Sequence, residues 1–200
     1  MFGRQLMTEI TSVAVFCGSK SGEDPKNAEE ARKFGEILAK KAIRLVYGGG
    51  GIGLMGVIAN SVIENGGEVT GVIPDFLMKL EVGSPDVHEL IVTENMHDRK
   101  RIMFERADGI VVLPGGLGTL DETFEIMTWK QLCQHEKPII IVNVNGYWDP
   151  FQALIEATIK GGFAHPAILD LYTIVERIED VVQALKNAPK PSDIVLTSHL

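Results

Sequence analysis

The chain has 200 residues, 45% of them hydrophobic, and a formal net charge of −8 at pH 7. A chain of this length and composition can bury one sizeable core, so we expect a single domain. The excess of acids argues against nonspecific binding to nucleic acid or to anionic membranes, although it leaves room for a small phosphate pocket.

The apolar segments are all too short to span a membrane. None approaches the roughly 20 residues that a transmembrane helix needs, and the opening MFGRQLMTEIT lacks the apolar stretch of a signal peptide. Cys17 and Cys133 lie in apolar surroundings without the spacing of a zinc or CxxC site. We therefore expect a cytoplasmic protein with reduced thiols and no membrane partner.

Seven short runs rich in β-branched residues predict the strands of a sheet. They are VAVF, RLVY, EVTGVI, LIV, GIVVL, PIIIVNV and YTIV, beginning at residues 13, 44, 68, 90, 109, 138 and 172. Most are continuously apolar, which is typical of strands covered on both faces. Helical patterns lie between them, so we predict an α/β fold with one doubly wound, mostly parallel, Rossmann-like sheet of about seven strands. This domain is expected at residues 12–188, between tails at 1–11 and 189–200.

Proline after an acidic residue predicts the start of two helices. Asp24-Pro25 and Asp149-Pro150 each combine a capping side chain with proline at the first helical position. Gly161-Gly162 predicts the end of the second of these helices. The segment GLMGVIANSVIEN, which begins at residue 53, is apolar over a wide arc, as in a helix packed firmly against a sheet.

Three of the predicted strands end in glycine-rich turns. These are CGSKSG after the first strand, YGGGGIGLMG after the second and PGGLGTLDE after the fifth. Ligands of doubly wound sheets bind outside the carboxyl ends of the strands, where these turns lie. Glycine is also an ordinary helix starter and close-packing residue, but three such turns on one edge favour a phosphate-bearing ligand.

The segment GIGLMG, residues 51–56, matches the GxGxxG pattern of dinucleotide sites, but two features argue against NAD. The motif follows the second strand instead of the first. The acidic residue required about 20 positions later can only be Asp75, which follows a proline. No Gly-Lys-Ser/Thr follows the glycines, so the segment is not a Walker loop either.

The segment NMHDRKRIMFERAD, residues 95–108, places Arg99 between methionines. On a helix, Met96, Arg99, Met103 and Arg106 share one face. A guanidinium on an apolar face needs an anionic partner, whereas a charge-rich helix start is often only a solvated surface. The pattern alone leaves both interpretations of Arg99 open.

Glu122 also has a purely structural interpretation. Thr119 and Glu122 have the spacing of a capping box, which stabilises a helix start by about 1 kcal/mol and needs no chemistry. Spacing alone favours this interpretation. His97 and His135 have no second imidazole or carboxylate at ligand spacing, so we expect no metal site.

Taken together, these segments resemble the LONELY GUY (LOG) family of cytokinin-activating phosphoribohydrolases, many members of which carry an older lysine decarboxylase label. The resemblance extends from about Val13 to Ile178. The hallmark PGGxGTxxE is complete as Pro114 to Glu122, and the Arg-Lys pair of the second hallmark is present in MHDRK. CGS, VYGGGGIGLMG, GVIP, TWKQL and HEKPIIIVNVNGYWD support it.

Three positions depart from the family's pattern. Lys20 stands where the family usually has a second serine after CGS, and Asp121 replaces the first residue of a common Glu-Glu pair. Cys133 replaces a common glycine after TWKQL. These departures bear on the preferred base more than on the reaction.

The resemblance implies hydrolysis of the N-glycosidic bond of a nucleoside 5′-monophosphate, either AMP or an N6-substituted adenine ribotide such as a cytokinin riboside 5′-monophosphate. The products are a free base and ribose 5-phosphate. Glu122 and Arg99 are the implied catalytic residues, with no cofactor. The substrate-binding residues expected from the motifs are Ser19, Gly49, Gly50, Gly53, Met96, Lys100, Pro114, Gly115, Gly116, Gly118 and Thr119.

The chemistry of these residue types fits such a reaction. Amides of the PGGLGT turn can hold the 5′-phosphate at a helix start. A carboxylate at Glu122 can stabilise the positive charge that grows on the sugar and can accept a proton from water. Arg99 can contact the phosphate, or it can hold Glu122 and the ribose. The sequence does not decide between these roles.

Two further questions stay open in the sequence. A non-catalytic nucleotide-binding carrier would need the same glycine turns and basic residue, so it is the alternative function. The resemblance implies a homodimer with the active site near its interface. Phe124 and Trp129 suit either such an interface or ordinary core packing.

Overall fold

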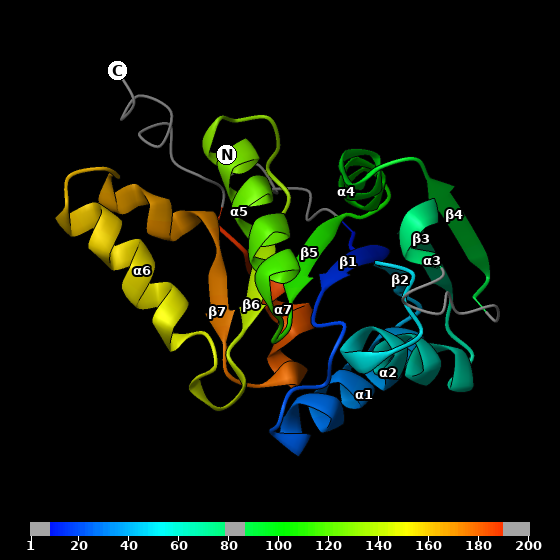
Figure 1. Cartoon of the computed structure of the whole chain (residues 1–200). Helices are drawn as coiled ribbons and strands as arrows, with labels where there is room; N and C mark the ends of the chain where they lie inside the picture. Colours follow the sequence, from blue (N-terminus) through cyan, green and yellow to red (C-terminus); the bar gives the residue numbers. More distant parts are fainter. Residues whose placement is uncertain (1–8, 79–86, 190–200) are drawn as a thin grey trace, which may run out of the picture.

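The computed structural model describes residues 9–78 and 87–189, which form one seven-stranded sheet between two layers of helices (Figure 1). The strands are β1 (Ser12–Phe16), β2 (Arg44–Tyr47), β3 (Val69–Pro74), β4 (Glu89–Thr93), β5 (Gly109–Val112), β6 (Ile139–Val142) and β7 (Thr173–Val175). Their order is β4-β3-β2-β1-β5-β6-β7, and all six pairings are parallel. The predicted Rossmann-like fold is confirmed.

The helices cover both faces of the sheet. They are α1 (Pro25–Lys40), α2 (Gly53–Glu64), α3 (Asp75–Met78), α4 (Met96–Glu105), α5 (Leu117–Gln131), α6 (Asp149–Lys160) and α7 (Val181–Asn187). Three short 3₁₀ turns are η1 (Val144–Gly146), η2 (Pro166–Leu171) and η3 (Ile178–Asp180). In Figure 1, α1 and α2 lie on one side of the sheet, and α4 and α5 lie on the other.

Alternate side chains along each strand pack into two separate cores, one on each face of the sheet. Val13 and Val15 of β1 pack with the residues of α1, α2 and α7, whereas Ala14 and Phe16 pack with those of α4, α5 and α6. Because successive side chains of a strand point to opposite faces, continuous apolar runs are what such a strand requires. This agrees with the expectation drawn from the sequence.

The strand order reverses between β1 and β5, and this fixes where a ligand can bind. The chain winds outward from β1 through β4 on one side, then returns to β5 and winds outward through β7 on the other. The loops that leave β1 and β5 therefore diverge, which opens a crevice at the carboxyl ends of these strands. Two of the three glycine-rich turns lie at this crevice, and the third follows the neighbouring strand β2.

Helices start at both predicted positions, but only one of the two predicted caps is confirmed. Asp24 caps α1, and its Oδ1 accepts a hydrogen bond from the amide of Lys26 at 2.9 Å. Asp149 does not cap α6 because the helix already begins at this residue, after Trp148 at the capping position. The Asp149 Oδ1 instead accepts from the Asn143 side-chain amide at 2.8 Å. Gly161 ends α6 as expected.

The tails were expected at residues 1–11 and 189–200, and almost all of both segments lies outside the described residues. Ile10 is an exception, since it is only 6% exposed and packs in the same core as Val13. The folded domain therefore begins before residue 12.

Phe124 and Trp129 make core contacts within the chain. The Phe124 ring lies 5.4 Å from that of Phe151, and the Trp129 ring lies 5.4 Å from that of Phe104. Both side chains are partly buried against the core under α5 and α6. Of the two interpretations left open by the sequence, these contacts favour core packing.

Helix α5 ends in a Schellman motif that has cysteine where glycine is usual. The Gln134 amide donates to the Trp129 carbonyl and the Cys133 amide donates to the Lys130 carbonyl, at 2.9 and 3.0 Å. This motif requires a left-handed residue, and Cys133 has φ of 53°. A Cβ atom is unfavourable in this region, which explains why glycine is common at this position in the LOG pattern.

We predict that Cys133→Gly raises the free energy of unfolding by about 0.5–1 kcal/mol, because it removes the left-handed penalty and adds a smaller cost in chain entropy. Urea unfolding measures the change. Cys133→Ala is the matched control, since it removes the thiol and keeps the strain. Equal stability of the Gly and Ala variants would contradict this account.

Candidate active site

The three glycine-rich turns meet at the carboxyl edge of the sheet and are joined by main-chain hydrogen bonds. The Gly18 amide, after β1, donates to the Pro114 carbonyl, after β5, at 3.0 Å. The Gly18 carbonyl accepts from the Leu54 amide, in the first turn of α2, at 3.1 Å. The expectation that these turns come together at one edge is confirmed.

Close approach of these loops explains why glycines are needed. Gly53 has φ of +61°, and a Cβ there would lie 2.3 Å from the Ser19 carbonyl carbon. A Cβ on Gly56 would lie 2.2 Å from the Gly51 carbonyl oxygen. The GxGxxG pattern is therefore accounted for by packing between the turns, and Gly53 sets the distance between α2 and the β1 loop.

A cavity of about 170 Å³ opens where the β1 and β5 loops meet α4 and α5. Its lining includes six of the predicted site residues and brings charged, amide and apolar groups together. The lining residues are Val15, Cys17, Gly18, Ser19, Gly48, Met55, Arg99, Met103, Gly116, Leu117, Gly118, Thr119 and Glu122.

The start of α5 supplies the amides of this cavity. Gly116 is the capping residue, the helix begins at Leu117, and the first helical bond runs from the Leu120 amide to the Gly116 carbonyl at 3.0 Å. The amides of Leu117, Gly118 and Thr119 therefore have no acceptor within the helix, which makes this end suited to an anion.

The capping-box interpretation of Thr119 and Glu122 is wrong. Thr119 lies inside the first turn of α5, and Gly116 occupies the capping position without a side-chain bond. Glu122, 6% exposed, faces the cavity instead. Sequence reasoning also passed over Leu117, whose side chain is 85% exposed but whose amide lies in this turn. The position of Leu117 inside the PGGLGT turn was the feature of the sequence that could have identified it.

Arg99 is held rigidly and points one nitrogen at Glu122. Its Nε donates to the Val72 carbonyl and its Nη2 to the Gly48 carbonyl, both at 3.2 Å. Its Nη1 lies 3.4 Å from Glu122 Oε1, and both side chains are 7% exposed. The carbonyls of Gly48, directly after β2, and of Val72, within β3, thus orient the guanidinium. Of the roles left open by the sequence, the observed contact is the one with Glu122.

The charge on this pair is favoured by its surroundings. A guanidinium within ion-pair distance favours the ionised carboxylate, as does the positive end of the α5 dipole. Cys17 lies in the same cavity, and burial raises the pKa of its thiol well above its ordinary value, with the Glu122 carboxylate adding to the effect. Cys17 is therefore a neutral wall of the cavity and not a thiolate nucleophile.

Lys100 does not reach the cavity. Its Nζ lies 3.0 Å from Asp121 Oδ2 and 2.9 Å from Glu125 Oε2, on the outer side of α5. Burial lowers the pKa of Lys100, but hydrogen bonds to Glu125 and Asp121 outweigh it and raise the pKa. In the structure Lys100 thus bridges α4 and α5, and the substrate contact expected of it stays a prediction.

Six other expected residues do not line this cavity. Two of them, Pro114 and Gly115, line a neighbouring cavity, and the other four are Gly49, Gly50, Gly53 and Met96. Gly49 and Gly50 are buried in the loop after β2, where a Cβ on Gly49 would lie 2.8 Å from that of Ile73. Gly48, which follows directly on β2, lines the cavity and accepts from Arg99. Met96 is not a lining residue either, but its sulfur lies 3.9 Å from Arg99 Nη1.

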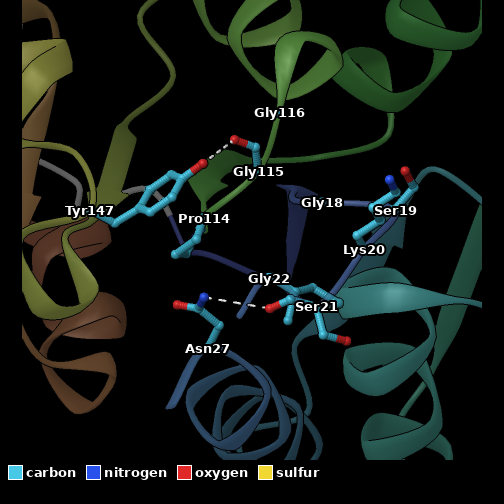
Figure 2. Close-up of a pocket in the computed structure, with 11 residues that line it drawn as sticks. Gly18, Ser19, Lys20, Ser21, Gly22, Asn27, Pro114, Gly115, Gly116 and Tyr147 are labelled. Atoms are coloured by element: carbon cyan, nitrogen blue, oxygen red, sulfur yellow. Dashed lines mark hydrogen bonds between the residues drawn. The ribbon is translucent and has the colours of Figure 1, made fainter. Parts of the chain in front are cut away.

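A second cavity, of about 350 Å³, adjoins the first and shares Gly18, Ser19 and Gly116 with it (Figure 2). Pro114 and Gly115 of the predicted set lie here. Sequence reasoning missed two of its polar residues, Asn27 and Tyr147, because both lie outside the glycine motifs. The lining residues are Gly18, Ser19, Lys20, Ser21, Gly22, Asn27, Leu54, Pro114, Gly115, Gly116 and Tyr147.

The described residues offer neither a metal centre nor a membrane-spanning helix. Within residues 9–78 and 87–189, no group of three or more His, Cys, Asp or Glu side chains is arranged to hold a metal ion. In the same part of the chain, no helix has the length and apolar character needed to cross a membrane.

The fold is shared with solved structures of low sequence identity. The molybdenum cofactor binding protein from Rippkaea orientalis superposes with a TM-score of 0.67 at 20% identity, over 90% of this chain and 97% of that one. The Moco carrier protein from Chlamydomonas reinhardtii gives the same TM-score and identity, over 90% and 98%. At this identity the likeness concerns the architecture alone.

Curated relatives share more of the sequence than these solved structures do. A cytokinin riboside 5′-monophosphate phosphoribohydrolase from Rhodococcoides fascians is 39% identical over 177 residues, 88% of this chain and 89% of the relative. A probable enzyme of the same name from Oryza sativa subsp. japonica is 43% identical over 151 residues, 76% and 68% of the two chains. The family model described as "Possible lysine decarboxylase" matches residues 55–185. With these matches and both hallmark motifs, the chain belongs to the LONELY GUY (LOG) family.

Proposed function

We propose that this protein hydrolyses the N-glycosidic bond of nucleoside 5′-monophosphates and releases a free base and ribose 5-phosphate. The observation that carries the proposal is the buried Arg99–Glu122 pair, which lines the same small cavity as the amide end of α5. A fixed carboxylate beside an anion site is the arrangement that cleavage of a ribose phosphate requires. The names of the relatives from R. fascians and O. sativa support the same reaction.

In this proposal the 5′-phosphate binds the free amides at the start of α5. Gly116, Gly118 and Thr119 line the cavity at this point, and Ser19 faces them from the β1 loop. Main-chain amides can bind a dianion without adding a positive charge that would neutralise Glu122. The anchored phosphate then fixes the position of the ribose.

Glu122 acts on the carbon that carries the base. Breaking the C1′–N9 bond builds positive charge on the sugar, which a nearby carboxylate stabilises. As the water oxygen bonds to C1′, Glu122 accepts a proton from the water and the C1′–N9 electron pair leaves with the base. The base takes up a proton from solvent, and Glu122 returns its own proton to solvent. Arg99 keeps the carboxylate ionised and aimed.

The substrate is proposed to be AMP or an N6-substituted adenine ribotide. The relatives named above act on cytokinin riboside 5′-monophosphate by their names, which favours an adenine ribotide. The homodimer and the cytoplasmic location implied at the sequence level stay predictions.

The other candidate functions are less well supported. A nucleotide carrier needs no buried carboxylate at the anion site, and the likeness to cofactor carriers rests on 20% identity. A lysine decarboxylase would need a lysine that can form a Schiff base in the site. Among the described residues that line the cavity of Glu122 there is no lysine.

The phosphate anchor predicts a strong preference for phosphorylated substrates. We expect free base from AMP and from isopentenyladenosine monophosphate, and at least about a 100-fold lower kcat/KM for the unphosphorylated nucleosides, since several charge-assisted hydrogen bonds are lost. Chromatography of the released base measures these rates. Absence of base release from every ribotide would leave the carrier interpretation.

Glu122→Gln is expected to lower kcat about 100- to 10,000-fold, because glutamine cannot accept the proton or stabilise the sugar cation. The variant should still fold, since the glutamine oxygen can accept from Arg99, and thermal unfolding checks this. Glu125→Gln, on the same helix but paired with Lys100, is the matched control and should stay active. Full activity of Glu122→Gln would reduce Glu122 to a structural role.

Gly48 gives an independent test of Arg99. A Cβ added at Gly48 would lie 1.9 Å from Arg99 Nη2, so the guanidinium must move. We predict that Gly48→Ala lowers kcat/KM by about 100-fold, because small misplacements of catalytic groups have effects of this size.

Gly66→Ala is the control for Gly48→Ala. It adds the same methyl group at the end of α2, where no atom lies within 4 Å of the new Cβ, at a left-handed position that costs stability. Gly66→Ala should keep its activity in spite of a lower unfolding temperature. Wild-type activity in Gly48→Ala would show that the orientation of Arg99 is not needed.

A further inference from the structure

Tyr147 lies outside every glycine motif, yet it contacts the turn that begins α5. Its hydroxyl donates a hydrogen bond of 2.6 Å to the carbonyl of Gly115. Figure 2 shows the side chain reaching from the loop after β6 to this carbonyl, at one wall of the second cavity. The ring also packs edge-on against Trp148, with centroids 4.9 Å apart. A half-exposed tyrosine thus bridges two loops at the mouth of the site.

The loop that carries Tyr147 is fastened on both sides. The Asn145 side chain donates to Asp24 Oδ2 at 2.7 Å and accepts from Lys26 Nζ at 3.0 Å, which joins the loop to the start of α1. At its base, Asn143 Oδ1 accepts from the Trp148 amide at 2.7 Å. Tyr147 therefore reaches Gly115 from a supported position.

The bond to Gly115 has a consequence for the next amide. In a planar trans peptide, the carbonyl of one residue and the N–H of the next point in opposite directions. Holding the Gly115 oxygen toward Tyr147 turns the Gly116 N–H away from it. Gly116 lines both cavities, and its amide lies at the start of α5. The preceding peptide is held in the same way, because the Pro114 oxygen accepts from the Gly18 amide.

We propose that Tyr147 is a positioning residue for phosphate binding, which fixes the Gly115–Gly116 peptide so that the Gly116 amide faces the anion. Glycines on both sides of this peptide make it easy to rotate, so an external hydrogen bond is needed to hold it. The inference rests on the proposed function for the identity of the anion, a 5′-phosphate. It assigns a part of the site to the loop between β6 and α6.

Calorimetric titration with ribose 5-phosphate tests the role without requiring catalysis. Tyr147→Phe removes only the hydroxyl, and we expect the Kd to rise about fivefold, the size of one hydrogen bond. With AMP, KM should rise by a similar factor and kcat should change little, because the phosphate is bound alike in substrate and transition state. Tyr172→Phe, a tyrosine in the core under α6, is the matched control and should bind as the wild type does.

The outcomes separate this inference from the proposed function. An unchanged Kd in Tyr147→Phe, or a lower kcat with an unchanged KM, overturns the role of Tyr147. If the wild type binds ribose 5-phosphate and Tyr147→Phe weakens it while no ribotide is hydrolysed, the positioning role holds and the hydrolase proposal fails. A wild type that does not bind ribose 5-phosphate overturns the inference together with the phosphate site.

A second variant covers the case in which Tyr147→Phe does not fold. Asn145→Ala keeps the hydroxyl but releases the loop from α1, so the hydrogen bond to Gly115 is less well held. Its Kd for ribose 5-phosphate should rise as well, by less than that of Tyr147→Phe. An unchanged Kd in Asn145→Ala, with no folded Tyr147→Phe to measure, counts against the proposal.

Discussion

The candidate site depends on one buried ion pair, Arg99 with Glu122. Taking two charges out of water is costly, and the attraction between them offsets this cost only when their remaining hydrogen-bonding groups are satisfied. The fold meets this condition with main-chain groups, since the carbonyls of Gly48 and Val72 accept from the guanidinium. Parallel strands make this arrangement available, because their carboxyl ends all lie at one edge. The bare glycine at position 48 leaves the space that the guanidinium occupies.

Lys100 of α4 pairs with carboxylates of α5 outside the cavity, whereas Arg99 of α4 pairs with a carboxylate inside it. Lys100 follows Arg99 directly, so the two side chains leave the helix about 100° apart. Arg99 turns inward to Glu122, while Lys100 meets Asp121 and Glu125, which are one turn apart on the outer side of α5. The cluster of acids after PGGLGT thus has two functions. One carboxylate faces the cavity, and the other two pair with Lys100 between α4 and α5.

The sequence predicted the sheet well because that prediction used local information. Short-range preferences account for the continuous β-branched runs, for the cap at Asp24 and for the glycine turns. The crevice between β1 and β5 then follows from the order of the strands. The failures have tertiary causes. Whether Gly48 or Gly49 faces the site depends on where β2 ends and where Arg99 reaches. The direction of Lys100 depends on acids 21 and 25 positions away on α5. Thr119 and Glu122 match a capping box, but α5 begins three residues before the start that this box requires. Tyr147 acts on Gly115 across 32 positions, which no local pattern reveals.

The preference for amides over cations at the anion site follows from the charges that must coexist there. A ribotide brings a phosphate dianion close to a carboxylate that has to stay ionised. A lysine in the cavity would bind the phosphate but would also compete with Arg99 for Glu122. Amides at a helix start attract the phosphate through partial charges and leave the ion pair intact. Their weakness is that a glycine-rich turn does not hold its peptides still. In the proposed site, the hydrogen bonds from Gly18 to Pro114 and from Tyr147 to Gly115 supply that rigidity, which is why we assign the loops around the site a part in phosphate binding.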